Sequence, residues 1–158
     1  MPAAAERPTK LGATPLPCGG ETYVVLADPP GHPFCLCRDE RAEGVGLAAI
    51  AFDCPDRHAL AAFYAAMLGM TTSYDEDVFG MISAAGQPTL GFQTVEVHTG
   101  PCWPDPARPQ QMHLDVELAD ADAAERAVLA LGATRLPGEG PGFRVFADPV
   151  GHPFCLVW

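Results

Sequence analysis

The ten residues ADPVGHPFCL at positions 147–156 decide how the chain is interpreted, because a nearly identical stretch, ADPPGHPFCL, occurs at positions 27–36. The two stretches are 120 residues apart. Aligned without gaps, residues 11–38 match residues 131–158 at 17 of 28 positions. Chance does not produce such identity, so the two segments are predicted to share one local fold.

The second copy of the repeat follows a predicted strand and helix. Residues 111–118 alternate between apolar and polar side chains, which indicates a half-buried strand. Asp122 and Glu125 fit a capping box at the start of a helix, and Gly132 fits its end. Short strands are then expected near 134–136, 143–146 and 153–158. This part of the chain therefore has the order β-α-β-β-β.

The middle of the chain shows the same order in a different sequence. Residues 45–52 are predicted to form a strand, and Pro55 suits a first helical turn that Asp53 or Asp56 caps. Gly69 ends this helix, and strands are expected near 70–74, 78–83 and 89–97. The core-facing stripe of the helix consists of Leu60, Phe63, Tyr64, Met67 and Leu68.

These patterns predict an α+β fold with two complete modules and one partial module. The predicted division is a disordered N-terminus at 1–10, a three-strand partial module at 11–38, a charged linker at 39–44, and a main domain at 45–158 with modules 45–97 and 111–158. The partial module either adds to a sheet edge, swaps into a neighbouring chain, or is a relic of a longer tandem protein.

Composition excludes some classes of function. The chain has 20 acidic and 9 basic residues and a net charge of −11, which disfavours nucleic acid and anionic membranes as partners. No apolar run approaches the roughly 20 residues of a membrane span, and the N-terminus lacks the apolar core of a signal peptide. The expected location is the cytoplasm, with the six cysteines as free thiols.

Several segments together resemble the vicinal-oxygen-chelate superfamily, in its glyoxalase-like branch. The resemblance rests on FDCPD at 52–56, FYAAMLG at 63–69, LGFQ at 90–93, MHLDV at 112–116 and FADPVGHPFCL at 146–156. It implies the glyoxalase/bleomycin resistance/dihydroxybiphenyl dioxygenase fold, in which paired βαβββ modules enclose a small-molecule cleft. By the same resemblance, the protein is expected to be a homodimer.

Many members of this superfamily bind a divalent metal through the first and last strands of each module. Those positions fall at Ala49, Gln93, His113 and Cys155 in this sequence, or at Leu47 in place of Ala49 if the register slips. Neither Ala49 nor Leu47 can bind metal, and a neutral amide adds little charge stabilisation. The expectation is therefore a site without a metal cofactor; if a metal binds, its ligands would be Gln93, His113 and Cys155.

Two readings remain open for His113, which shares the polar face of its strand with Asp115 and Glu117. It faces the cleft as a ligand-binding or acid–base group, or it is a hydrogen-bonded structural residue. Cys155 has the parity to reach the same cleft as a thiolate, but a small buried apolar side chain is the favoured reading. The histidines of both Gly-His-Pro turns, His32 and His152, are expected to be structural.

The remaining site candidates are three aromatic residues and one cysteine. Trp103 and Cys102 lie between the modules, where they either close over a ligand or a partner subunit, or anchor the loop. Tyr74 and Phe79 are expected on the cleft wall.

The sequence thus predicts a binder of an aromatic or planar metabolite or antibiotic, without metal. The alternative is a lyase or isomerase of the glyoxalase type that uses His113 with Gln93 as its catalytic residues. A metal-dependent dioxygenase is less favoured. The ligand-binding candidates are Gln93, His113, Cys155, Trp103, Tyr74 and Phe79.

Overall fold

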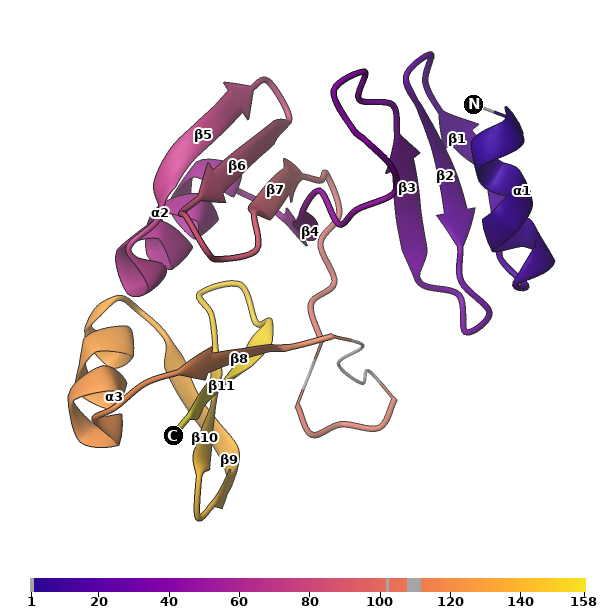
Figure 1. The fold of residues 1–158 in the computed structure, drawn as a ribbon. Helices are drawn as coiled ribbons and strands as arrows, with labels where there is room; N and C mark the ends of the chain where they lie inside the picture. Colours follow the sequence, from indigo (N-terminus) through magenta and orange to yellow (C-terminus); the bar gives the residue numbers. More distant parts are fainter. Residues whose placement is uncertain (1, 102, 108–111) are drawn as a thin grey trace. The chain divides into compact units, whose positions relative to one another are not determined.

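The computed structural model describes residues 2–101, 103–107 and 112–158, which contain three separate β-sheets (Figure 1). The chain divides into two compact units, Met1–Gly46 and Leu47–Trp158, which are described separately. The larger unit holds the two predicted modules, and the smaller one holds the first copy of the repeat. None of the helices in the described residues has the length and apolar character needed to cross a membrane.

The first module of the larger unit has the predicted βαβββ order. Its elements are β4 (Ile50–Cys54), α2 (Arg57–Leu68), β5 (Thr71–Glu76), β6 (Phe79–Ser83) and β7 (Leu90–Thr94). The sheet order is β4-β7-β6-β5, with β4 and β7 parallel. Asp56 caps α2 by accepting hydrogen bonds from the backbone N–H groups of His58 and Ala59, and Gly69 ends it in the left-handed region (φ 66°). The predicted Asp56 cap and the Gly69 end are confirmed, but Pro55 lies before the cap and not in the first helical turn.

The second module repeats this architecture. Its elements are β8 (Leu114–Glu117), α3 (Ala121–Ala130), β9 (Thr134–Gly140), β10 (Phe143–Ala147) and β11 (Pro153–Val157), in the sheet order β8-β11-β10-β9. The predicted capping box is wrong, because Asp120 rather than Asp122 caps α3, accepting from the Ala123 N–H at 2.9 Å. Asp122 instead accepts a hydrogen bond from Arg144 on β10.

The two modules share one hydrophobic core. Phe63 on α2 packs against Phe154 on β11, and Tyr64 donates a hydrogen bond to Asp148 at 3.0 Å. Phe92 on β7 and Phe146 on β10 are fully buried in the same core. The helix-covered face of each sheet therefore points into common apolar packing, and the other face of each sheet carries both polar and apolar side chains.

The smaller unit contains one helix more than predicted. Its elements are α1 (Pro2–Lys10), β1 (Thr14–Gly19), β2 (Tyr23–Ala27) and β3 (Pro33–Cys37), and its sheet order is β1-β2-β3. The prediction of a disordered segment at 1–10 is wrong. Residues 2–10 lie 120 positions before 122–130 in α3, and the backbone bond from Ala13 to Pro8 has its counterpart from Ala133 to Val128. The helix thus belongs to the repeat.

Candidate functional site

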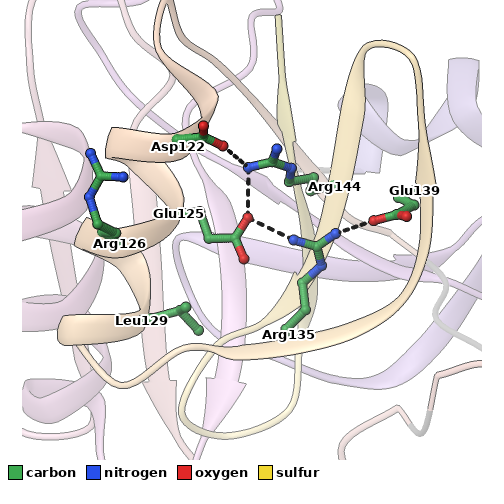
Figure 2. A pocket seen from close by; sticks show the side chains of 7 residues that line it. All are labelled: Asp122, Glu125, Arg126, Leu129, Arg135, Glu139 and Arg144. Atoms are coloured by element: carbon green, nitrogen blue, oxygen red, sulfur yellow. Dashed lines mark hydrogen bonds and ion pairs between the residues drawn. The ribbon is translucent and has the colours of Figure 1, made fainter.

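A charged hollow of about 400 Å³ lies beside α3 (Figure 2). Arg144 donates to Asp122 and Glu125, and Arg135 donates to Glu125 and Glu139, at 2.6–2.8 Å. These two guanidinium groups are already paired with carboxylates, so they offer little free charge to an anionic ligand. The network joins α3 to β9 and β10 and has a structural role.

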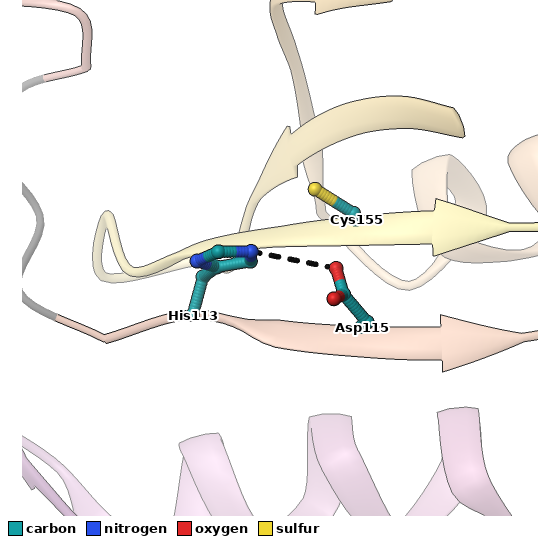
Figure 3. Close-up of side chains that lie close together, drawn as sticks. All are labelled: His113, Asp115 and Cys155. Carbon is teal, nitrogen blue, oxygen red and sulfur yellow. Dashed lines mark ion pairs between the residues drawn. The ribbon is translucent and has the colours of Figure 1, made fainter. Parts of the chain in front are cut away.

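A different group of polar side chains gathers on the face of the second sheet opposite the core. One ligand atom each of His113, Asp115 and Cys155 lies within 4.8 Å of the other two (Figure 3). His113 Nε2 and Asp115 Oδ1 are 3.4 Å apart, with side chains 41% and 60% exposed. Cys155 is half-buried. An imidazole, a carboxylate and a thiol thus meet at an accessible surface.

Strand periodicity explains why these three side chains meet. On β8, Leu114 and Val116 pack against the core, so the alternate residues at 113 and 115 face the other way. On β11, Phe154 and Leu156 are buried, which turns Cys155 to the same side. β8 and β11 are parallel neighbours in which Asp115 pairs directly with Cys155. Met112, which falls within the predicted strand 111–118, is 62% exposed, because β8 begins only at Leu114.

Asp115 is the residue of this group that ligand reasoning from the sequence missed. The strand pattern places Asp115 on the same side as His113, but the metal-ligand positions that the superfamily resemblance implies do not include Asp115. Burial raises the pKa of the Cys155 thiol, and the charge of Asp115 and a hydrogen bond to it raise that pKa further. Without a cation nearby, the pair therefore favours a thiol over a thiolate at neutral pH.

Trp103 lies on the same face of this sheet. Its indole N–H donates to the Pro137 carbonyl at 2.7 Å. A Cβ placed on Gly138 would lie 3.2 Å from Cγ2 of Val145 and 3.8 Å from Nε1 of Trp103. Val145 is the direct β10 partner of Cys155. The indole is therefore anchored over the sheet that carries the polar group, and Trp103 remains 36% exposed.

The other three predicted site residues form a second group on the first sheet. Phe79 pairs with Gln93 between β6 and β7, and the Phe79 and Tyr74 rings are 6.3 Å apart. Gln93 is exposed and pairs with Asp53 on β4. The structure thus assigns the predicted residues to two sheets: His113, Cys155 and Trp103 to one, and Gln93, Phe79 and Tyr74 to the other. Cys102 lies outside the described residues.

The predicted structural role of His152 agrees with its contacts. Its Nδ1 lies 2.8 Å from Asp148 Oδ2, and its backbone N–H donates to Asp148 Oδ1. The equivalent His32 makes the same two contacts with Asp28 in the first copy of the repeat. The ring of His152 also packs against Phe52 and His98.

Comparison with known proteins gives one family and a set of related folds. The profile of the glyoxalase-like domain family matches residues 49–157. Comparison with curated proteins gave no match. Among solved structures, a glyoxalase/bleomycin resistance protein/dioxygenase family enzyme from Burkholderia phytofirmans PsJN is 19% identical, with a TM-score of 0.56 over 71% of this chain and 97% of its own.

Two further solved structures are similar. Fosfomycin resistance protein FosX from Listeria monocytogenes is 18% identical, with a TM-score of 0.56 over 72% of this chain and 92% of its own. Glyoxalase I from Zea mays is 23% identical, with a TM-score of 0.68; that match covers 98% of this chain and 62% of the maize chain. The maize match therefore includes the smaller unit. At these identities the similarity shows the fold alone.

Proposed function

Because the chain belongs to the glyoxalase-like domain family, we propose that it binds a small aromatic or planar molecule, a metabolite or an antibiotic, over the polar face of the β8-β11-β10-β9 sheet. The observation that carries the proposal is the convergence of His113, Asp115 and Cys155 on that face. Trp103, whose indole N–H donates to Pro137 on β9 of the same sheet, offers an aromatic surface for stacking. The exposed thiols Cys18, Cys35 and Cys37 favour a reducing compartment such as the cytoplasm.

Replacing His113 with Ala should weaken the binding of a ligand found by thermal-shift screening at least tenfold, or about 1.4 kcal/mol. The imidazole is 41% exposed and supplies both a donor and an acceptor, so its loss removes direct contacts. Isothermal titration of the purified protein measures the effect. His58→Ala, which alters an imidazole 68% exposed on α2, is the matched control and should leave the affinity unchanged.

Ligand position has an independent readout in tryptophan fluorescence, because the chain has two tryptophans. A ligand over Trp103 should quench its emission, so quenching should persist in Trp158→Phe and disappear in Trp103→Phe. Equal affinity of wild type and His113→Ala, or quenching that depends on Trp158, would place the ligand elsewhere.

We also propose that a second copy of the chain completes the cleft. The helix-covered faces of the two sheets are occupied by their shared core, so the polar face of each needs another module to enclose a ligand. In a two-fold dimer, the face with His113 would meet the partner's face with Gln93, Phe79 and Tyr74. This arrangement would unite the predicted residues that one chain distributes over two sheets.

Mixing two defective variants tests this arrangement. His113→Ala and Gln93→Ala should each lose binding, whereas random subunit exchange between them should restore about a quarter of the sites. Half of the exchanged dimers are mixed, and one of their two sites carries neither substitution. Ligand stoichiometry and sedimentation velocity measure the outcome. A monomer at micromolar concentration, or no recovery after proven exchange, contradicts the shared site.

The second candidate is a lyase or isomerase of the glyoxalase type. It is favoured by the 3.4 Å separation of His113 Nε2 and Asp115 Oδ1, since a carboxylate that orients an imidazole suits acid–base chemistry. Gln93 would act from the partner's sheet. Glyoxalase-type turnover that falls at least a hundredfold in His113→Ala, with an unchanged melting temperature, would favour this candidate.

A further inference from the structure

We propose that Cys35 and Cys37 bind one copper(I) ion on the exposed face of β3, with Cys18 on β1 as a third thiolate nearby. This site lies in the unit Met1–Gly46, so it goes beyond the proposed function, whose residues all belong to the other unit. All three cysteines are exposed free thiols. Soft sulfur ligands of this kind select copper(I).

The alternation of β3 places two thiols side by side. Exposed residues alternate with half-buried ones along Pro33–Cys37. Cys35 and Cys37 therefore share the exposed face, and Leu36 between them faces the other way. Residues two apart on a strand are separated by about 6.5–7 Å, and rotation of both side chains brings the sulfurs closer. A linear ion with metal–sulfur bonds of about 2.3 Å needs its sulfurs about 4.6 Å apart, so this pair can bind one without a shift of the backbone.

The position of β3 in its sheet leaves these thiols accessible. In the described residues, the sheet β1-β2-β3 has no strand beyond β3 (Figure 1). The equivalent strand of the second repeat, β11, is instead paired with β8, and its Cys155 is half-buried beside Asp115. Cys35 and Cys37 are therefore open to an ion from solution, and no ladder partner competes for them on the outer edge of the strand.

The repeat indicates that the fold does not require these thiols. The residues 120 positions after Cys35, Cys37 and Cys18 are a cysteine, a valine and a glycine. The valine, Val157, lies on β11 where it is half-buried, and the second module forms the same three-strand ladder with it. Two of the three thiols are thus additions of the first copy that its ladder does not need, which favours a role in binding.

The three thiols also interact electrostatically. Burial raises the pKa of the Cys35 thiol, and the charges of Cys37 and Cys18 raise that pKa further. Cys35 therefore keeps its proton at neutral pH while no cation is present. A bound cation attracts each thiolate and offsets their mutual repulsion, so it displaces the protons. Binding through Cys35 and Cys37 forms two copper–sulfur bonds and releases two protons to the buffer.

The donor set suits copper(I) better than zinc. Zinc sites in proteins use three or four ligands, usually with histidine or carboxylate among them when cysteines are few. Among the described residues, no histidine or carboxylate joins these thiols within the 4.8 Å that the donor atoms of His113, Asp115 and Cys155 span. Sulfur donors alone and a low coordination number favour copper(I). The reducing compartment that exposed thiols favour would keep both the thiols and the ion reduced.

Competition with a copper(I) chelator tests the site. The full-length chain is reduced and titrated without oxygen against copper(I) held by bicinchoninate, whose coloured complex fades when the protein takes the ion. The expected result is one ion retained per chain, with about two protons released per ion, measured with a pH indicator. Cys35→Ser and Cys37→Ser should each weaken the affinity by about a hundredfold or more, and Cys18→Ser by about tenfold.

Cys155→Ser is the matched control, because it alters the equivalent thiol of the second repeat and should leave the copper(I) affinity unchanged. Circular dichroism establishes that each variant is folded. Folded wild type that yields its copper(I) to the chelator has no such site, and retention lost in Cys155→Ser places the ion in the larger unit. Either outcome overturns the proposal.

The single variants decide the ligands separately. Equal affinities of wild type and Cys37→Ser would contradict the two-thiolate site, and an unchanged affinity in Cys18→Ser would contradict the third thiolate. No organic molecule is added in this titration, so its result is independent of the ligand-binding test on the larger unit. A chain that retains copper(I) through Cys35 and Cys37 supports this site even if no small molecule binds near His113.

Discussion

Replacing Asp148 with Ala is expected to destabilise the unit Leu47–Trp158 by about 3–5 kcal/mol. Asp148 is only 3% exposed and accepts hydrogen bonds from Tyr64 Oη and from the backbone N–H groups of Val150 and His152. Its Oδ2 also lies 2.8 Å from His152 Nδ1. Truncation leaves these buried donors unpaired and removes the hydrogen bond from Tyr64 that joins the two modules. Urea unfolding followed by tryptophan fluorescence measures the loss, because both tryptophans lie in this unit.

The repeat provides the control. Asp28 makes the same turn contacts with His32 in the smaller unit, but its side chain is 36% exposed, and no tyrosine among the described residues donates to it. Asp28→Ala should leave the fluorescence transition within about 0.5 kcal/mol of wild type. A loss below about 1 kcal/mol in Asp148→Ala would mean that the buried carboxylate does not hold the modules together.

The Asp148 carboxylate should also make the stability of the fold depend on pH in the acid range. Burial alone would raise the pKa of Asp148, but its hydrogen bonds with His152 and the attraction of that ring outweigh burial and lower the pKa below 3.8. A lowered folded-state pKa stabilises the fold above the unfolded value and loses that contribution as pH falls through the folded value. Wild type should therefore lose stability below about pH 4, and Asp148→Ala should show a shallower decline.

The parts of this fold that local rules govern could be predicted from the sequence. Asp56 and Gly69 mark the two ends of α2. Both could be predicted, because a side-chain cap and a left-handed glycine depend on only a few adjacent residues. The repeat predicted that β1–β3 would resemble β9–β11, and both form antiparallel three-strand ladders. Helix α1 was missed because the repeat was aligned only from residue 11, although the 120-residue offset extends to it. Local rules do not favour this helix, since Pro8 lies inside it and its first turn has no acidic residue.

The site could be predicted only in part, because it depends on contacts between distant segments. Strand parity placed His113 and Cys155 on one face, but the ladder that sets Asp115 beside Cys155 follows from the parallel pairing of β8 and β11. Nor does the sequence show that both sheets direct their helix-covered faces into one core. That packing separates Gln93 from His113 within a chain, and no local pattern encodes it.

Replacing Phe154 with Ala should destabilise the same unit by about 3–5 kcal/mol. Phe154 is fully buried, stacks on Phe146 with ring centroids 5.6 Å apart, and meets Phe63 of the first module at 6.2 Å. Truncation removes most of an aromatic side chain and leaves a cavity where the modules meet. Urea unfolding followed by tryptophan fluorescence measures the loss of stability. Phe143→Ala, on the adjacent strand but 39% exposed, should cost about 1 kcal/mol or less.

Substitution of the neighbouring residue, Cys155, extends this experiment from the core to the candidate site. Cys155 follows Phe154 on β11 but points to the opposite face, so Cys155→Ser should cost less than about 1 kcal/mol. A large loss in Phe154→Ala beside a small one in Cys155→Ser would fit a strand with one face in the core and one available for a ligand. If Cys155→Ser costs as much as Phe154→Ala, then Cys155 is the small buried apolar residue that the sequence favoured. The thiol would then be too deeply packed to turn toward His113 and Asp115, and the polar face would lose its third polar group.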